Sequence, residues 1–452
     1  MQMNIENTGK IKDHIIDTIK LSYPVIIGQA GVIMMGVVDN ILVGGLGATA
    51  LAAASVANSL FILVFILGIG VCSSVTPLTA ISVGAGKKNE CRTIFTQGHF
   101  VNLIVSIILM MVTYFASDFF YLLHQSPEAV KLAAPYTKIL ALSMIPVLIF
   151  QTNKQFIEGL SIMRPGMIIT IAANIINGLV GWVLIYGKFG MPRLGLNGAG
   201  IATFSSRTFM ALTITLYIFS SSKFRELNLS LRIKEINTVI IKKILSLGIP
   251  SAVQYFFEVG AFSMAAIMVG WLGVAQLAAH QIALNLASIS FMCTLGISTA
   301  GSIRVANGVG RKDITEIRRA GFTAILLGET LMACFGLVFI TFRNTLPSFY
   351  IHDPSVISIA SSLLIIAALF QVFDGTQAVG IGILRGLTDV KWPTLITFVA
   401  YWIIGLPLGY LLAFTFNLGV QGVWIGLMAG LITSAVLLTL RFNHKSKQRV
   451  VF

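Results

Sequence analysis

The chain has 452 residues, of which 56% are hydrophobic and 11% are charged, and its formal net charge is +14. Roughly 25% of the residues of a soluble domain are charged, so this composition excludes a soluble globular protein. Apolar stretches long enough to cross a hydrocarbon layer of about 30 Å recur along the whole length, so we predict an all-α, polytopic membrane protein.

Twelve such stretches predict twelve transmembrane helices. In chain order they cover residues 18–45, 52–83, 94–122, 130–157, 164–187, 195–220, 240–271, 277–306, 319–342, 355–384, 393–416 and 420–441. Residues 1–24, which overlap the start of the first stretch, lack the basic start and short apolar run of a cleavable signal, and predict a short amphipathic segment on the membrane surface. The four cysteines have no CxxC spacing, which favours neither a disulfide framework nor a metal site.

The basic residues gather at alternate ends of these helices. Most fall before the first helix, after the second, fourth, eighth and tenth, between the sixth and seventh, and in the C-terminal tail. The opposite ends carry only Lys131, Lys138, Lys188, Arg193 and Arg343. Basic loops stay in the cytoplasm and the helix count is even, so we predict a multi-pass protein of the cytoplasmic (inner) membrane with both termini cytoplasmic. The net charge is then a topology signal, and we expect no nucleic-acid partner.

The second half of the chain repeats the first. Residues 22–54 align with residues 248–280, so that Pro24 falls on Pro250. Later matches follow in the same order, and they pair Gly84 with Gly308, Glu158 with Arg385 and Gly195 with Gly419. The repeat predicts two pseudo-symmetric six-helix bundles. They share one orientation, because six crossings return the chain to its starting side.

The repeat also sets the predicted domains. They are an N-terminal six-helix lobe at 1–220, a cytoplasmic inter-lobe linker at 221–243 and a C-terminal six-helix lobe at 244–452. Parallel repeats of this kind are one of the plans of membrane transporters, whose substrate and ion sites lie near the bilayer midplane.

Only four of the 17 acidic residues fall well inside apolar helices, namely Asp39, Glu258, Glu329 and Asp374. Each costs at least ~2.5 kcal/mol at the bilayer centre, so each is expected to face a cavity or a partner. Packing, with a neutral and hydrogen-bonded acid, is the alternative for all four. Arg207, also deep in a predicted helix, is expected to neutralise an acid of the N-terminal lobe.

Glu258 and Asp374 are predicted to share one depth. At a helical rise of ~1.5 Å per residue, Glu258 lies about 22 Å beyond Lys243, and Asp374 lies about 16 Å before Arg385. Both positions are near the midplane of the same lobe. Two adjacent buried carboxylates either share a proton or bind a cation between them, which makes this pair the candidate ion site.

The chain resembles the multidrug and toxic compound extrusion (MATE) family over nearly its whole length. The motifs that carry the resemblance are MGVVDNILVG, TPLTAISVGAGK, GIPSAVQYFFEVGAF, LAAHQIALN, RVANGVGR and FQVFDGTQAVGIGILRGL. FFEVGAF and FQVFDGTQ are similar to the NorM-type bacterial branch. That resemblance implies that Glu258 and Asp374 bind the coupling cation, as ligands of Na⁺ if the protein is sodium-coupled, and that Asp39 is the acid of the N-terminal lobe.

The resemblance also implies candidate positions in the substrate cavity, namely Phe262, Gln281, Asn174 and Asn177. Interhelical hydrogen bonding and core packing are the alternatives for these residues. Another bacterial branch has an acid in the fifth helix, where this chain reads ITIAANIINGLVGW. That departure weakens the case for a cation site in the N-terminal lobe.

The predicted function is a cation-coupled antiporter that exports organic, cationic compounds by alternating access in exchange for Na⁺ or H⁺. No HExxH, GxSxG or P-loop spacing is present, so we expect neither an enzyme nor a cofactor besides the coupling ion. The expected partners are small organic cations and the lipid bilayer, and the expected state is a monomer. A flippase for lipid-linked saccharides is the alternative, although it predicts a more cationic cavity. A channel would not explain the repeat.

Overall fold

The computed structural model describes residues 11–123, 127–231 and 236–448. Twelve spans among these residues are long and apolar enough to cross a membrane, and the described residues contain no strand. The predicted all-α class and the twelve helices are therefore confirmed. The contacts divide the chain into two compact units, which we call unit 1 and unit 2.

Unit 1 comprises Ile27–Ala252. Its helices are α1 (Ile11–Gly44, from Ile27 onward), α2 (Ala48–Cys72), α3 (Val75–Gly84), α4 (Lys88–Ala116), η1 (Ser117–Leu123), α5 (Pro127–Leu142), α6 (Met144–Gly159), α7 (Arg164–Tyr186), α8 (Leu196–Ser220), η2 (Ser222–Leu227) and the first part of α9 (Thr238–Gly270). They pack around buried side chains such as Tyr136, Met144 and Leu148.

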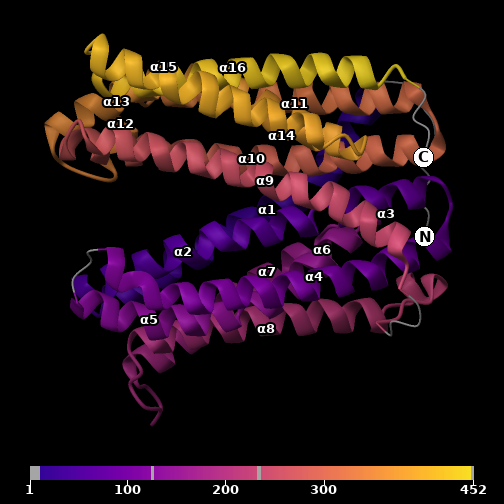
Figure 1. Cartoon of the computed structure of the whole chain (residues 1–452), viewed down its shortest axis with the longest axis horizontal. Helices are drawn as coiled ribbons and strands as arrows, with labels where there is room; N and C mark the ends of the chain where they lie inside the picture. The colour runs from indigo at the N-terminus through magenta and orange to yellow at the C-terminus, as the bar shows by residue number, and fades with distance from the viewer. Residues whose placement is uncertain (1–10, 124–126, 232–235, 449–452) are drawn as a thin grey trace. The chain divides into compact units, whose positions relative to one another are not determined.

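Unit 2 comprises residues 253–448 together with residues 11–26. Its helices are the rest of α9, α10 (Val274–Arg311), α11 (Ile314–Thr341), α12 (Thr345–Ser348), α13 (Pro354–Gly386), α14 (Lys391–Phe398), η3 (Val399–Gly405), α15 (Leu406–Tyr410), η4 (Leu411–Thr415) and α16 (Gly419–Lys445). The long helices of unit 2 run alongside one another in Figure 1. Their core includes Leu363, Tyr401 and Trp424.

The unit boundaries fall inside α1 and α9, whereas the sequence places the lobe boundary in the linker at 221–243. Part of that linker contacts α4. Lys88 Nζ of α4 lies 2.6 Å from Glu226 Oε2 of the linker, and Thr96 Oγ1 of α4 donates a hydrogen bond to the Ser230 carbonyl at 2.8 Å. The hydrogen bond and charge of Lys88 lower the pKa of Glu226. Residues 232–235 of the predicted linker lie outside the described residues.

Residues 11–24, the described part of the expected surface segment, do not form an element separate from the first helix. These residues form the first turns of α1, which continues through Pro24 to Gly44 as one helix. Proline is tolerated inside transmembrane helices because neighbouring groups satisfy the freed carbonyl. Residues 1–10 of the expected segment lie outside the described part of the chain.

Serines interrupt two of the predicted helices. The second predicted helix is divided between α2 and α3 at Ser73 and Ser74, and the fourth is divided between α5 and α6 at Ser143. Each of these serine hydroxyls donates to the carbonyl three residues earlier, at 2.6–2.8 Å. Such hydrogen bonds compete with the helical ladder, and hydropathy alone does not reveal them.

Left-handed backbone positions recur at equivalent places in the two units. The pairs and their φ angles are Gly47 and Gly273 (109° and 136°), Gly86 and Lys312 (70° and 60°), Ser161 and Thr388 (62° and 58°), and Gly195 and Gly419 (55° and 56°). The same turns therefore join corresponding helices in both halves. At the second turn the structural pair is Gly86 and Lys312, so the sequence match of Gly84 with Gly308 is displaced there.

Close helix contacts repeat as well. A Cβ on Gly159 would lie 2.8 Å from the carbonyl oxygen of Thr76, and a Cβ on Gly386 would lie 2.5 Å from that of Ser302. Gly159 and Gly386 are the glycines of the EGLS and RGLT segments that the sequence repeat aligns. Only a residue without a side chain permits this approach, which explains the glycine in both halves.

Two π-helical segments, η3 and η4, flank α15 in the predicted eleventh helix. On this span, Gly405 and Gly409 pack directly against Gly426 and Gly430 of α16. A Cβ on Gly426 would lie 2.3 Å from the Cα of Gly409. Small residues facing one another in this way let transmembrane helices approach closely.

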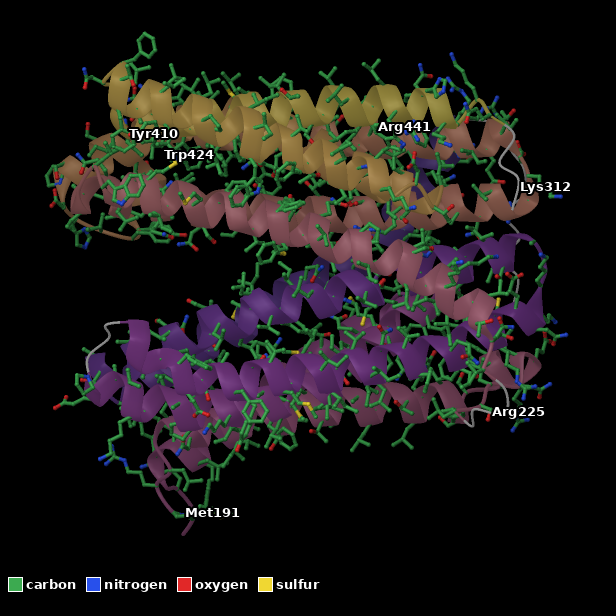
Figure 2. The ribbon with its side chains drawn as sticks, viewed as in Figure 1. Met191, Arg225, Lys312, Tyr410, Trp424 and Arg441 are labelled. Carbon is green, nitrogen blue, oxygen red and sulfur yellow. The ribbon has the colours of Figure 1, made fainter. Side chains whose placement is uncertain are left out.

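Basic side chains gather at one end of unit 2. Arg441 Nε lies 2.7 Å from Asp389 Oδ2, and Arg318 donates to Asn443 O at 3.3 Å. Figure 2 shows Lys312 and Arg441 toward the same end of this unit, with Tyr410 and Trp424 toward the opposite end. This arrangement agrees with the predicted alternation of basic and non-basic loops.

Candidate ion and substrate site

Glu258 is a buried residue of unit 2. It lies on α9, its residue is 9% exposed, and its Oε1 accepts a hydrogen bond from Gln377 Nε2 of α13 at 3.2 Å. A buried carboxylate keeps its charge only if hydrogen bonds or a cation compensate for the lost water. This local environment supplies one such hydrogen bond.

Asp374 lies on α13 and is 4% exposed. It is close enough to Glu258 for the two carboxyl groups to interact electrostatically. The structure therefore brings together the two acids that the sequence places at one depth. No group of three His, Cys, Asp or Glu side chains able to hold a metal ion occurs within the described ranges. A carboxylate pair suits a proton or a hard monovalent cation rather than a soft transition metal.

Sequence reasoning missed Gln377 and Tyr401. Gln377 lies one turn after Asp374 on α13, and Tyr401 belongs to the π-helical segment η3. Both are fully buried, and the Tyr401 hydroxyl donates to Gln377 Oε1 at 3.0 Å. The motif FQVFDGTQ contains a signal for Gln377, an amide three residues from a deep acid. Nothing in the sequence places Tyr401 beside it.

Arg385 approaches the pair from the end of α13. The sequence predicts that Arg385 marks the cytoplasmic end of this helix. In the structure, its Nη1 donates a hydrogen bond to the Tyr255 hydroxyl at 3.0 Å. The guanidinium also lies 5.2 Å from the centre of the Tyr255 ring. Tyr255 precedes Glu258 by one helical turn, so a positive charge lies near the carboxyl group of Glu258. The Nε and Nη2 atoms of Arg385 have no hydrogen-bond partner among the described residues.

The two candidate cavity residues of unit 2 differ in their surroundings. Phe262 packs on the core of the unit, with ring centres 6.3 Å from Phe370 and 5.8 Å from Tyr401. Gln281 of α10 is exposed. Glu329 of α11 accepts a hydrogen bond from Thr376 at 3.0 Å, and the charge that acts on Asp374 is that of Glu258 rather than Glu329.

In unit 1, Asp39 of α1 lies among polar groups of α7 and α8. Its Oδ2 accepts a hydrogen bond from Thr203 Oγ1 at 3.3 Å, and Asn177 lies beside it. Within the described ranges, neither amide atom of the buried Asn177 has a hydrogen-bond partner within 3.5 Å. Asn174 donates to Gly31 O of α1 at 2.8 Å, which is the interhelical hydrogen bonding that the sequence leaves open for it.

Arg207 of α8 has partners that the sequence could not name. Its Nη1 donates to Ser143 Oγ at 2.6 Å, and its guanidinium lies 4.3 Å from the centre of the Phe61 ring. The charge of Arg207 also acts on Asp39. The expected neutralisation of an N-terminal acid is thus combined with a hydrogen bond and a cation–π contact.

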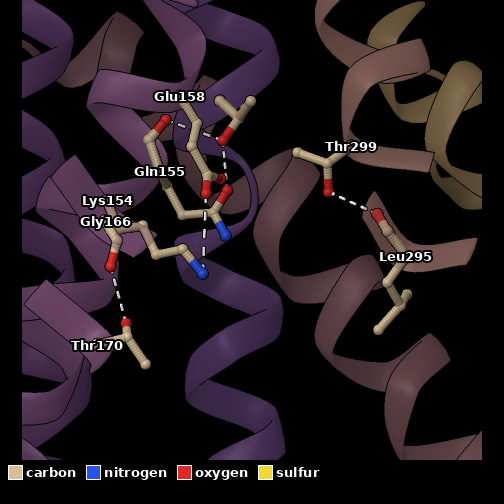
Figure 3. A network of polar contacts seen from close by, with 8 residues as sticks. Lys154, Gln155, Glu158, Gly166, Thr170, Leu295 and Thr299 are labelled. Atoms are coloured by element: carbon tan, nitrogen blue, oxygen red, sulfur yellow. Dashed lines mark hydrogen bonds and ion pairs between the residues drawn. The ribbon is translucent and has the colours of Figure 1, made fainter. Parts of the chain in front are cut away.

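A second buried polar network lies at the end of α6. Lys154 Nζ lies 3.8 Å from Glu158 Oε1, and both side chains are almost fully buried. Figure 3 shows Lys154, Gln155 and Glu158 converging, with Thr170 donating to the Gly166 carbonyl nearby. Gln155 accepts from the Thr76 hydroxyl of α3. The hydrogen bonds of Thr76 join α3 to α6, and the Thr170 hydrogen bond stays within α7.

The sequence matches a known protein family and several curated relatives. The MatE family model matches residues 24–183 and again residues 250–411, so each half of the repeat carries one copy. The multidrug resistance protein NorM of Aliivibrio fischeri is 36% identical over 436 residues, which cover 96% of this chain and 95% of that protein. The multidrug resistance protein MdtK of Pectobacterium atrosepticum is 36% identical over 433 residues, covering 95% of each chain.

Solved structures share the fold. The eukaryotic MATE transporter AtDTX14 superposes with a TM-score of 0.87 at 22% identity, covering 97% of this chain and 98% of the other. An outward-facing multidrug resistance MATE transporter gives 0.88 at 20% identity, covering 97% and 96%. The family match over both halves and the relatives of nearly equal length lead to one conclusion. The chain belongs to the MatE family, the multidrug and toxic compound extrusion transporters whose NorM-type branch its helix motifs resemble.

Proposed function

We propose that the chain is a multidrug exporter that moves organic, cationic compounds out of the cell in exchange for Na⁺ or H⁺. The observation that carries the proposal is the buried pair of Glu258 and Asp374 in unit 2. Two carboxyl groups that interact inside a membrane protein can hold either a shared proton or a cation between them. The names of the relatives support multidrug compounds as the substrates.

Coupling follows from one ion site that both sides of the membrane reach in turn. A cation bound at Glu258 and Asp374 would favour the conformation that releases the drug outward, and drug binding from inside would favour release of the cation. Such coupling is reciprocal, because each ligand changes the other's affinity by the same factor. We propose alternating access as the way in which the protein avoids an open pore.

Asp39 is the proposed ion-responsive acid of unit 1. The hydrogen bond from Thr203 and the Asn177 amide beside Asp39 support this role, because amide and hydroxyl oxygens are good ligands for hard cations. The nearby charge of Arg207 opposes cation binding there. We therefore assign the principal coupling site to unit 2.

The remaining parts of the proposal concern location and assembly. The alternation of basic loops supports a cytoplasmic membrane location with both termini in the cytoplasm. We propose a monomer whose partners are its small organic substrates and the bilayer, without a nucleic-acid partner, a cofactor or an enzymatic reaction. The names of the relatives, which are resistance proteins, agree with a transporter rather than an enzyme.

Efflux of ethidium from proteoliposomes tests the proposal. Glu258→Gln and Asp374→Asn are expected to reduce gradient-driven efflux to the level of protein-free vesicles, because either change removes half of the carboxylate pair. Asp39→Asn is expected to retain part of the efflux. Glu329→Gln is the matched control, since Glu329 is also an acid inside a helix but bonds to Thr376 instead.

Na⁺ and pH gradients are imposed separately in this experiment, so that the driving ion is identified. Undiminished efflux by well-folded Glu258→Gln and Asp374→Asn would overturn the ion site. Absence of ethidium efflux by the wild-type protein under both gradients would overturn the exporter and favour the flippase alternative.

A further inference from the structure

We infer that Gln377 and Tyr401 are positioning residues that hold Glu258 in its ion-binding orientation. The inference rests on the proposed function and adds to it how the affinity for the coupling ion is set. Gln377 Nε2 donates to Glu258 Oε1 at 3.2 Å, and the Tyr401 hydroxyl donates to Gln377 Oε1 at 3.0 Å. Three elements, α9, α13 and η3, thus meet in one chain of hydrogen bonds.

The directions of these two hydrogen bonds show which protonation state of Glu258 they favour. The phenol occupies the amide oxygen of Gln377, so the NH₂ group of the amide is turned toward Glu258. An N–H donor stabilises an ionised carboxylate more than a neutral one. The observed pattern therefore favours the charged form of Glu258, which is the form that binds a cation.

The reverse pattern keeps Glu258 and Gln377 paired after protonation of Glu258. A protonated Glu258 would donate to Gln377 Oε1, and the Gln377 NH₂ group would donate to the Tyr401 oxygen. Rotation of one amide thus keeps Glu258 and Gln377 hydrogen-bonded to each other in either state, whereas the Tyr401 hydroxyl hydrogen keeps its acceptor only in the observed pattern. Apolar residues at these positions could not respond in this way.

Tyr401 reaches Gln377 because η3 is fixed on α9. The next residue, Trp402, donates from Nε1 to the Phe257 carbonyl at 3.0 Å, and its ring fills the space beside Gly260. The Tyr401 ring packs on Phe262 of the same helix. π-Helical turns are frequent at functional sites. Here the turn directs a phenol into the core of unit 2.

The other ionisable groups around Glu258 are Asp374 and Arg385 on α13, Tyr255 on its own helix and Tyr401 on η3. Asp374 opposes the charged form of Glu258 and Arg385 favours it. Gln377 makes the hydrogen bond to Glu258 and carries no charge. Its removal therefore changes ion affinity while leaving the number of charges in the site unchanged.

The test measures the ion and pH dependence of ethidium efflux from proteoliposomes. Gln377→Leu is expected to raise the half-saturating Na⁺ concentration about tenfold, the usual effect of losing one hydrogen bond to a charged group. Under a proton gradient, the pH of half-maximal efflux is expected to rise by about one unit, because the proton then competes better for Glu258. Efflux at saturating ion is expected to persist. Tyr401→Phe is expected to shift both values in the same direction by less.

Gln371→Leu is the matched control. Gln371 is an equally buried glutamine of α13, and its Oε1 accepts from Ser290 on α10 at 2.9 Å. The control is expected to lower stability without shifting either dependence. Wild-type dependences in both Gln377→Leu and Tyr401→Phe would overturn the inference. If Glu258→Gln also kept wild-type dependences, the proposed function itself would fail.

Discussion

Buried charges in this protein are compensated locally, and the pair of Lys154 and Glu158 is the clearest case. Its side chains are 10% and 5% exposed, the least among the ion pairs of the described residues. Such a pair adds little net stability over apolar residues, but breaking it leaves one charge without compensation. Its contribution is therefore visible only when one partner is removed.

We predict that Glu158→Gln lowers the free energy of unfolding by about 3 kcal/mol, because Lys154 is then buried without a counter-charge. The double variant Lys154→Met, Glu158→Leu is expected to recover most of this loss. Tryptophan fluorescence during unfolding in SDS provides the measurement. Asp118→Asn serves as the control, since its partner Lys138 is partly exposed and the expected loss is below about 1 kcal/mol. Equal losses in both single variants would contradict the prediction.

The candidate acids were predictable at this scale, whereas their partners were not. Hydropathy marks Glu258 and Asp374 because a charge in an apolar helix is costly, and helical rise gives their depth. The contact between Tyr401 and Gln377 joins residues 24 positions apart in the sequence. It depends on which face of each helix meets the other, and one sequence does not fix that. The contacts of Arg207 with Ser143 and Phe61 have the same origin.

At the scale of elements, the left-handed turns show how the repeat is maintained. Thr388 adopts a φ of 58°, although a β-branched residue is strained there, and Gly419 adopts 56° without strain. A Cβ on Gly419 would meet no atom within 4 Å. A substitution of Gly419 therefore acts through the backbone conformation alone.

We predict opposite effects of substitutions at these two turns. Thr388→Gly is expected to raise the free energy of unfolding by about 1 kcal/mol, and Gly419→Ala is expected to lower it by about the same amount. The melting temperature of the purified protein is the measurement. Ser161→Gly, at the equivalent turn of unit 1, should change in the same direction as Thr388→Gly. A decrease for Thr388→Gly would show that its side chain stabilises the turn by contacts.

The existence and order of the helices were predictable because transmembrane segments must be long and apolar. The breaks inside these helices were less predictable from the sequence. The hydroxyls of Ser73 and Ser143 interrupt helices whose apolar pattern is continuous, and η3 leaves the composition of its span unchanged. The start of α1 was missed for a related reason, since its first turns are polar and hydropathy reports only the part that fits the bilayer.

For the whole molecule, the distribution of charge predicts the direction of insertion. Arg225 of η2 and Met191 of the loop between α7 and α8 are exposed and lie at opposite ends of unit 1 (Figure 2). The positive-inside rule places the end with Arg225 in the cytoplasm. We expect the same rule to hold for both halves, because six crossings would return the chain to its starting side.

We predict that Met191→Cys reacts with a membrane-impermeant maleimide in right-side-out vesicles and that Arg225→Cys reacts only after permeabilisation. The background carries Cys293→Ser and Cys334→Ser, because Cys72 and Cys91 are buried. Arg225→Cys in inside-out vesicles is the positive control. Labelling of Arg225→Cys in sealed right-side-out vesicles would reverse the assigned topology.

The π-helical segment η3 has a consequence for how the chain tolerates length changes. A π turn holds one residue more than the α turn that it replaces, so deleting a single residue from Val399–Gly405 would convert it to α-helix rather than break it. The helices before and after would keep their register, because the deleted residue is the one that the wider turn accommodates. The Gly405 and Gly409 face would still meet α16, whereas residues within the turn, Tyr401 among them, would change direction. The extra residue thus sets where the Tyr401 phenol points without displacing the helix face that packs on α16.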